Sequence, residues 1–178
     1  MRAIIIRTHL VFYCLLGSAF PLLAADLSDL TYDASGATVI ITDCDTAASG
    51  ALVIPGTIEG KVVTSIGTTT FRDCTSLTGI TLPASVTSIG AHAFRDCTSL
   101  ATITIGNSVT SIGSYAFRDC TELRRVHFEG ALPTFGTDVF SGADQSFITY
   151  PGSLTTVAGR PAYDSRHIPV PAIQQLAG

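Results

Sequence analysis

This sequence of 178 residues has few charged side chains, only 13%, and no tryptophan. Soluble domains carry roughly 25% charged residues. The ten Lys and Arg residues form no clustered patch and the net charge is −4, so we exclude a dedicated nucleic-acid-binding protein and expect no nucleic-acid partner. Hydrophobic residues make up 46%, which excludes an intrinsically disordered chain. The length fits one domain with an appendage.

Signatures of catalysis and of cofactor binding are also absent. The sequence contains no phosphate-binding G-x-x-x-x-G-K-[ST], no zinc-protease H-E-x-x-H and no nucleophile-elbow G-x-S-x-G. Its cysteines form no C-x₂₋₄-C pair and no histidine follows their spacing, which argues against a zinc site. We therefore predict a protein that is not an enzyme and that holds no cofactor or metal.

Residues 1–25 have the layout of a secretory signal peptide. Arg2 and Arg7 form a positive leader, a nearly uninterrupted apolar run follows, and two alanines end the segment. The run is shorter than the ~20 apolar residues that span a bilayer, and it contains Pro21. We expect cleavage after Ala25, with a site one residue earlier as the alternative. The mature chain is then secreted or held at the cell surface, with no membrane span of its own.

A repeat with a constant period of 23 dominates the middle of the chain. The string Ser-Ile-Gly-x-x-x-Phe-Arg-Asp-Cys-Thr occurs at 65–75, 88–98 and 111–121, and columns of aliphatic residues follow the same step. A single unit is too small to bury its apolar residues, so the units must stack as a solenoid. The predicted core ladder consists of Phe71, Phe94, Phe117, Phe140, Cys74, Cys97 and Cys120.

Each unit has two parts with different patterns. In residues 77–82, apolar Ile80 and Leu82 alternate with a polar residue, as in a short strand, and Pro83 ends the strand. Residues 89–97 place apolar side chains at 89, 93, 94 and 97, which is the spacing of a helical or 3₁₀ turn. The predicted fold class is an α/β solenoid, a short right-handed leucine-rich-repeat coil. Its parallel sheet lies on the concave side and its helical or 3₁₀ turns lie on the convex side.

The pattern L-x-x-I-x-L-P-x-x-V-x-x-I-G-x-x-A-F-x-x-C, found at 77–97 and in close form at 100–120, resembles the BspA-like (treponemal-type) leucine-rich-repeat family. The resemblance covers roughly residues 51–140. It departs from the pattern where Gly106 and Asn107 replace the Pro-Ala of the preceding unit. The resemblance implies a bacterial cell-surface or secreted protein, in a family some of whose members adhere to host or matrix proteins.

The two ends of the chain depart from the repeat, as solenoid caps do. Residues 26–50 contain two strand patterns joined by a Ser-Gly turn, and we predict an N-terminal β-hairpin cap. The leucine-rich-repeat domain is placed at 51–151, with a surface excursion around 58–61 and a last strand near residue 150 that closes the sheet. Residues 152–178 are expected to form a loosely ordered tail.

The cysteines allow two interpretations in an exported protein. Four remain after removal of the signal peptide, and a ladder spacing of ~4.8 Å falls within the ~4.4–6.8 Å between Cα atoms that a disulfide accepts. Adjacent rungs of one column nevertheless point their Cβ atoms in parallel, which opposes the torsion of the bond. Buried thiols that act as small apolar fillers are the favoured interpretation, and a single disulfide is the alternative.

The candidate binding face lies on the concave side of the predicted sheet, where side chains between inward positions point outward. Its residues are Thr81, Thr102, Thr104, Arg125 and His127. No Asp or Glu accompanies them, so they suit recognition better than catalysis. A solvated face without a ligand is the alternative. The Arg-Asp pairs at 72–73, 95–96 and 118–119 similarly form either a stripe that captures a polar partner or a charge-neutral solvated surface.

Two functions remain in competition. The first is an exported, non-catalytic binding module, expected to be a monomer, that recognises a protein or a glycan and takes part in adhesion. The alternative is a structural or assembly spacer, or a fragment of a larger repeat protein, without a ligand of its own.

Overall fold

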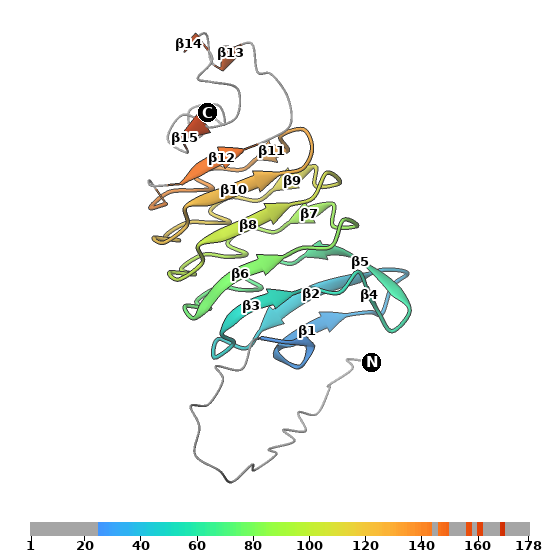
Figure 1. Ribbon diagram of the computed structural model, residues 1–178. Coiled ribbons are helices and arrows are strands. Elements are labelled where there is room, and N and C mark those ends of the chain that lie inside the picture. The colour runs from blue at the N-terminus through green and yellow to red at the C-terminus, as the bar shows by residue number, and fades with distance from the viewer. Residues whose placement is uncertain (1–24, 144–145, 150–155, 158–159, 162–167, 170–178) are drawn as a thin grey trace, which may run out of the picture.

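The computed structural model describes residues 25–143, 146–149, 156–157, 160–161 and 168–169. They build a solenoid whose coils stack along one axis, with a sheet on each of two sides (Figure 1). The six-stranded sheet consists of β3 (Gly50–Val53), β6 (Leu77–Thr81), β8 (Thr102–Ile105), β10 (Arg125–Phe128), β12 (Phe147–Thr149) and β15 (Ile168–Pro169). The second sheet consists of β1 (Leu30–Asp33), β2 (Val39–Cys44), β4 (Thr57–Ile58), β5 (Lys61–Ile66), β7 (Ser88–Ile89), β9 (Ser111–Ile112) and β11 (Thr134–Phe135).

Neighbouring central strands of the six-stranded sheet pair in parallel, one repeat apart. Ile80 of β6 lies opposite Ile103 of β8, which lies opposite Val126 of β10. Burial alternates along each strand because successive side chains point to opposite faces. In β10, for example, Val126 and Phe128 are buried and Arg125 is exposed. The parallel sheet and the leucine-rich-repeat solenoid that the period predicts are therefore confirmed.

The structure differs from the prediction in the segment expected to be a helical turn. Residues 88–89 form the short strand β7, and residues 91–96 form turns. His92 and Asp96 have φ angles of 55° and 62°, in the left-handed region, so a right-handed helix cannot pass through them. The same turns occur in the neighbouring coils.

Hydrogen bonds between coils explain why turns replace the helix. The backbone N–H groups of His92, Phe94 and Asp96 donate to carbonyls of the next coil over 3.0, 2.7 and 2.9 Å. These groups are therefore satisfied without the i→i−4 bonds of a helix. The one helical segment of the described residues is the 3₁₀ turn η1 (Leu27–Asp29). The fold is a β-solenoid, and the helical part of the predicted α/β class is not formed.

The core between the two sheets consists of residues stacked from coil to coil. The rings of Phe71, Phe94, Phe117 and Phe140 lie 5.0, 5.0 and 5.3 Å apart between centroids, within 8° of parallel. All four rings are buried, as are the three cysteines at 74, 97 and 120. Buried aromatic rings contribute large apolar areas, so this stack adds to the cohesion between coils.

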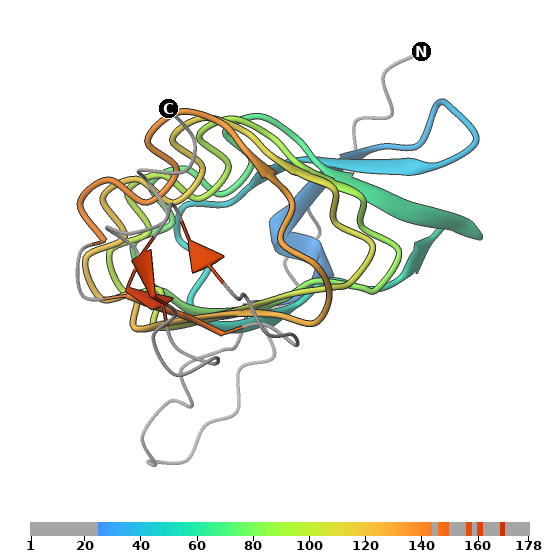
Figure 2. The ribbon, with the colours of Figure 1, turned by 90° about the horizontal axis from the view of Figure 1, so that it is seen from above.

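At the N-terminal end, β1 and β2 pair antiparallel as a hairpin, and β2 then pairs parallel with β5. Seen along the solenoid axis, β1 lies within the outline of the coil (Figure 2). Leu30 of β1 is buried, and Tyr32 packs against the core. The hairpin expected in residues 26–50 is thus present, and its first strand lies over the first coil.

The excursion expected around residues 58–61 is a second hairpin, in which β4 pairs antiparallel with β5. Glu59 and Gly60 have φ angles of 53° and 75°, as a tight hairpin turn requires. The Tyr32 hydroxyl donates to Glu59 Oε1 over 2.9 Å, and Lys61 Nζ donates to the carbonyl of Ala34. The excursion therefore contacts the N-terminal hairpin.

At the other end, β12 adds to β10 with Ile148 opposite Val126. This step is one position shorter than the repeat, as the sequence spacing predicts. The sheet does not end there, because β15 pairs antiparallel with β12. Residues 168–169, expected in the tail, therefore form the edge strand. A two-stranded pair, β13 (Thr156–Val157) with β14 (Arg160–Pro161), precedes it. The predicted signal peptide, apart from Ala25, and most of the predicted tail lie outside the described residues.

Candidate functional site

All five predicted binding residues lie in two adjacent columns on the outside of the six-stranded sheet. One column contains Ala51, Gly79, Thr102 and Arg125, and the other contains Val53, Thr81, Thr104, His127 and Thr149. We call this surface the outer sheet face. Its character changes along the axis: Val53 near one end is 66% exposed, threonine hydroxyls occupy the middle, and basic side chains lie on β10.

The basic end of the outer sheet face is the part best suited to bind a polar ligand. Arg125 is exposed, and among the described residues no carboxylate pairs with it. His127 is half-buried, and its Nδ1 lies 2.8 Å from Thr149 Oγ1. That contact fixes the orientation of the imidazole. The neighbouring Arg124 is instead engaged with Glu122 Oε2, 3.1 Å from its Nη2.

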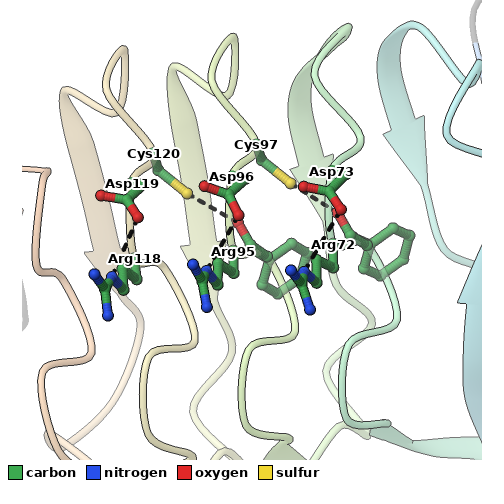
Figure 3. Close-up of polar contacts among 10 residues, drawn as sticks. Arg72, Asp73, Arg95, Asp96, Cys97, Arg118, Asp119 and Cys120 are labelled. Carbon is green, nitrogen blue, oxygen red and sulfur yellow. Dashed lines mark hydrogen bonds and ion pairs between the residues drawn. The ribbon is translucent and has the colours of Figure 1, made fainter.

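The Arg-Asp pairs form a row along the turns, shown for three coils in Figure 3. In each coil the arginine Nε lies 3.1–3.5 Å from a carboxylate oxygen of the next residue. The three aspartates share the left-handed φ of about 60° that turns the chain here. Because each arginine is neutralised within its own coil, the row is a balanced surface, and such pairs at a solvated surface contribute little free energy.

A ladder of hydroxyls on the second sheet was not predicted. The hydroxyls of Thr87, Thr110 and Thr134 each donate to the backbone carbonyl of a threonine in the preceding coil, over 3.1–3.2 Å. The repeated Val-Thr-Ser-Ile-Gly of the sequence could have revealed the hydroxyls of Thr87 and Thr110, whereas Thr134 lies one position beyond that column. These hydroxyls are occupied in holding coils together, so this face offers fewer free groups to a ligand.

The four described cysteines are buried, and this structure has them in the reduced form. Cys97 and Cys120 each donate to the carbonyl of a phenylalanine one coil earlier, over 2.9 and 3.0 Å. Burial raises the pKa of the Cys120 thiol to about 12 and also raises the pKa of Cys97. Thiols with raised pKa values remain protonated at neutral pH, so neither is a reactive nucleophile.

Across the described residues, no group of three or more His, Cys, Asp and Glu side chains is arranged to hold a metal ion. Within the same part of the chain, no helix has the length and apolar character needed to cross a membrane.

Stacked coils with a period of 23 that each contribute one strand to the same parallel sheet are typical of a leucine-rich-repeat protein. The family model for the BspA type leucine rich repeat region matches residues 54–167 in six copies. The chain belongs to this BspA-type family, which confirms the resemblance seen at residues 77–97 and 100–120.

Solved structures of bacterial leucine-rich-repeat proteins are similar to this chain. The protein from T. pallidum is 29% identical with a TM-score of 0.61, and the match covers 74% of this chain and 65% of that protein. The protein from Bacteroides capillosus is 28% identical (TM-score 0.57; 67% and 94% covered), and that from Bacteroides ovatus is 26% identical (TM-score 0.52; 68% and 36% covered). No curated protein matches the chain. These matches indicate no enzymatic family and support a repeat-based role in binding or as a scaffold.

Proposed function

We propose that this protein is an exported, non-catalytic binding module that recognises a protein or a glycan through its outer sheet face and takes part in adhesion. The observation that carries the proposal is the position of Arg125 and His127, which lie two residues apart on β10 and directly follow Thr102 and Thr104 in the two columns. Family membership supports a binding role, and the lack of an acid in these columns argues against catalysis.

The scaffold of the outer sheet face favours binding because it is rigid before the ligand arrives. Each central strand is held on both sides by parallel pairing, and the buried core lies behind it. Binding then orders few groups, which lowers its entropic cost.

The chemistry of the outer sheet face suits an extended ligand that carries carboxylates or hydroxyls. Arg125 offers a planar fork for a carboxylate. Thr81 and Thr104 offer hydroxyls at the ~4.8 Å spacing of adjacent strands, and Thr102 offers a third two residues before Thr104 on β8. Val53 adds an exposed apolar contact near the other end.

Changing Arg125→Ala together with His127→Ala is expected to weaken binding at least tenfold, because the basic end of the outer sheet face is lost. The ligand is first found by screening immobilised proteins and glycans with the purified protein, and affinities are then measured by biolayer interferometry. Arg72→Ala with His92→Ala removes the same residue types from the turns, and this control should keep wild-type affinity. An affinity unchanged in the Arg125 and His127 variant would show that the ligand binds elsewhere.

Export is expected to remove residues 1–24. Ala25 is only 8% exposed, and its N–H donates to the Ser49 carbonyl over 2.8 Å. Cleavage after Ala24 keeps this contact, whereas cleavage after Ala25 removes it, so the packing supports the alternative site. N-terminal sequencing of protein recovered outside the cytoplasm should begin at Ala25. Protein that stays in the cytoplasm with Met1 in place would contradict export.

A scaffold or assembly element is the second candidate. Strand β3 is the edge of the six-stranded sheet, and Val53 on it is exposed. Unpaired edges can add a strand from another chain. The relative from Bacteroides ovatus is also much longer than this chain. Light scattering of the purified protein separates the two candidates, because a monomer at all concentrations argues against assembly.

A further inference from the structure

The cysteine column has a regular part whose thiols are fully accounted for. Cys97 and Cys120 lie one repeat apart, and each donates to a phenylalanine carbonyl of the preceding coil, Phe71 and Phe94 respectively. Repetition of one contact at one position of the coil gives these two thiols a packing role.

Cys74 breaks this regularity, because its acceptor is not the backbone carbonyl one repeat before that of Phe71. The position one repeat before Phe71 is occupied by Ala48. The Cys74 sulfur contacts the carbonyl oxygen of Asp45 instead, over 3.8 Å, and the sulfur of Cys44 contacts the same oxygen over 3.6 Å. Both contacts are longer than those of the regular thiols, and two sulfurs meet at one acceptor.

Cys44 has no place in the repeat, because its separation from Cys74 along the chain is not a multiple of the repeat period. It ends β2, whereas Cys74 lies at the end of the turns before β6. The two side chains therefore come from different parts of the coil. The parallel Cβ directions that disfavour a disulfide within the column are not imposed on this pair.

We propose that Cys44 and Cys74 form a disulfide, while Cys97 and Cys120 remain thiols. The bond joins the N-terminal hairpin covalently to the first coil of the repeat. Both residues are buried, so the bond is protected from reduction once the protein is folded.

The oxidant is a disulfide, RS–SR, of the kind found in oxidising compartments outside the cytoplasm. To that extent the inference rests on the proposed export. One cysteine thiolate attacks RS–SR and releases RS⁻, which takes up a proton as RSH. The second thiolate attacks the protein sulfur of the mixed disulfide and releases a second RSH. Two protein thiols are thus oxidised to one disulfide, and one RS–SR is reduced to two RSH.

The bond forms while the hairpin is still undocked. In the folded reduced protein, the hydrogen bond with Cys74 and burial raise the pKa of the Cys44 thiol. The Cys44 thiolate is then scarce, which slows attack by this residue. Oxidation during refolding is therefore expected to be faster than oxidation of the folded, reduced protein.

Oxidised glutathione added to the purified, reduced protein during refolding tests the inference. Trypsin cuts after Lys61, Arg72 and Arg95, so that Cys44, Cys74 and Cys97 fall on separate peptides. Mass spectrometry after alkylation should find the Cys44 and Cys74 peptides linked, with Cys97 and Cys120 alkylated. Both thiols of the pair alkylated, or Cys74 linked to Cys97, would overturn the proposal.

The melting temperature provides a second measurement. Oxidation should raise it by about 5–10 °C, since the bond closes a loop of about 30 residues. Cys97→Ala should keep this increase and Cys44→Ala should lose it. An exported chain that keeps both thiols overturns the disulfide alone. A chain that forms the bond with glutathione yet stays in the cytoplasm overturns export alone.

Discussion

Phe94→Asp is expected to unfold the coils around residue 94. The ring is fully buried, with the rings of Phe71 and Phe117 each 5.0 Å away. Removing a buried phenylalanine costs about 3–5 kcal/mol, and burying an unpaired carboxylate adds to that cost. The sum is comparable to the whole stability of a domain, about 5–15 kcal/mol. Circular dichroism on heating should show that the cooperative transition is lost or shifted far down.

Two further variants make this result specific to the ring stack. Val53→Asp introduces the same charge at an exposed position and should melt close to wild type. Phe94→Leu keeps the site apolar and should give a smaller loss, because only part of the stacking is removed. Wild-type melting of Phe94→Asp would mean that the phenylalanine column does not point inward.

The register of the sheet could be predicted because it depends only on counting. A constant step brings equivalent residues into line, and the slightly shorter step between Val126 and Ile148 predicts the observed pairing of β10 with β12. The strand β15 could not be predicted in this way, since residues 168–169 lie outside the repeat.

The turns could not be predicted because their cause is tertiary. Apolar spacing at 89, 93, 94 and 97 is compatible with a helix. The left-handed φ of His92 and Asp96 becomes favourable only when the next coil accepts the freed N–H groups. A period in the sequence shows that coils stack, but it does not show that stacking supplies the backbone hydrogen bonds of the turns.

Some features of the candidate site could likewise be predicted from the sequence, and others could not. Alternation along β10 predicts that Arg125 and His127 point outward, and they do. The contact of His127 with Thr149 requires knowledge of which strand lies beyond β10. The convergence of Cys44 on Cys74 was equally hidden, because Cys44 belongs to no column.

Gly113→Ala is expected to lower stability by about 3 kcal/mol, through overpacking of two adjacent coils. A Cβ at this position would lie 2.4 Å from the backbone nitrogen of Ala91 and 2.8 Å from its Cα. A Cβ at the equivalent glycines, 67, 90 and 136, would also lie within 3.0 Å of backbone atoms in the preceding layer of the stack. Backbone atoms cannot turn aside as a flexible side chain can, so the coils must separate locally. The melting temperature should fall by about 10 °C.

Gly79→Ala is the matched control, since it makes the same change in the same kind of repeat. Its Cβ would approach nothing closer than Thr102 Oγ1, 3.9 Å away on the outer sheet face. This variant should melt within a few degrees of wild type, because a methyl group there meets solvent and an ordinary van der Waals contact. If Gly113→Ala melted like Gly79→Ala, glycine would not be setting the distance between coils, and the ring stack and the hydrogen bonds between coils would define it.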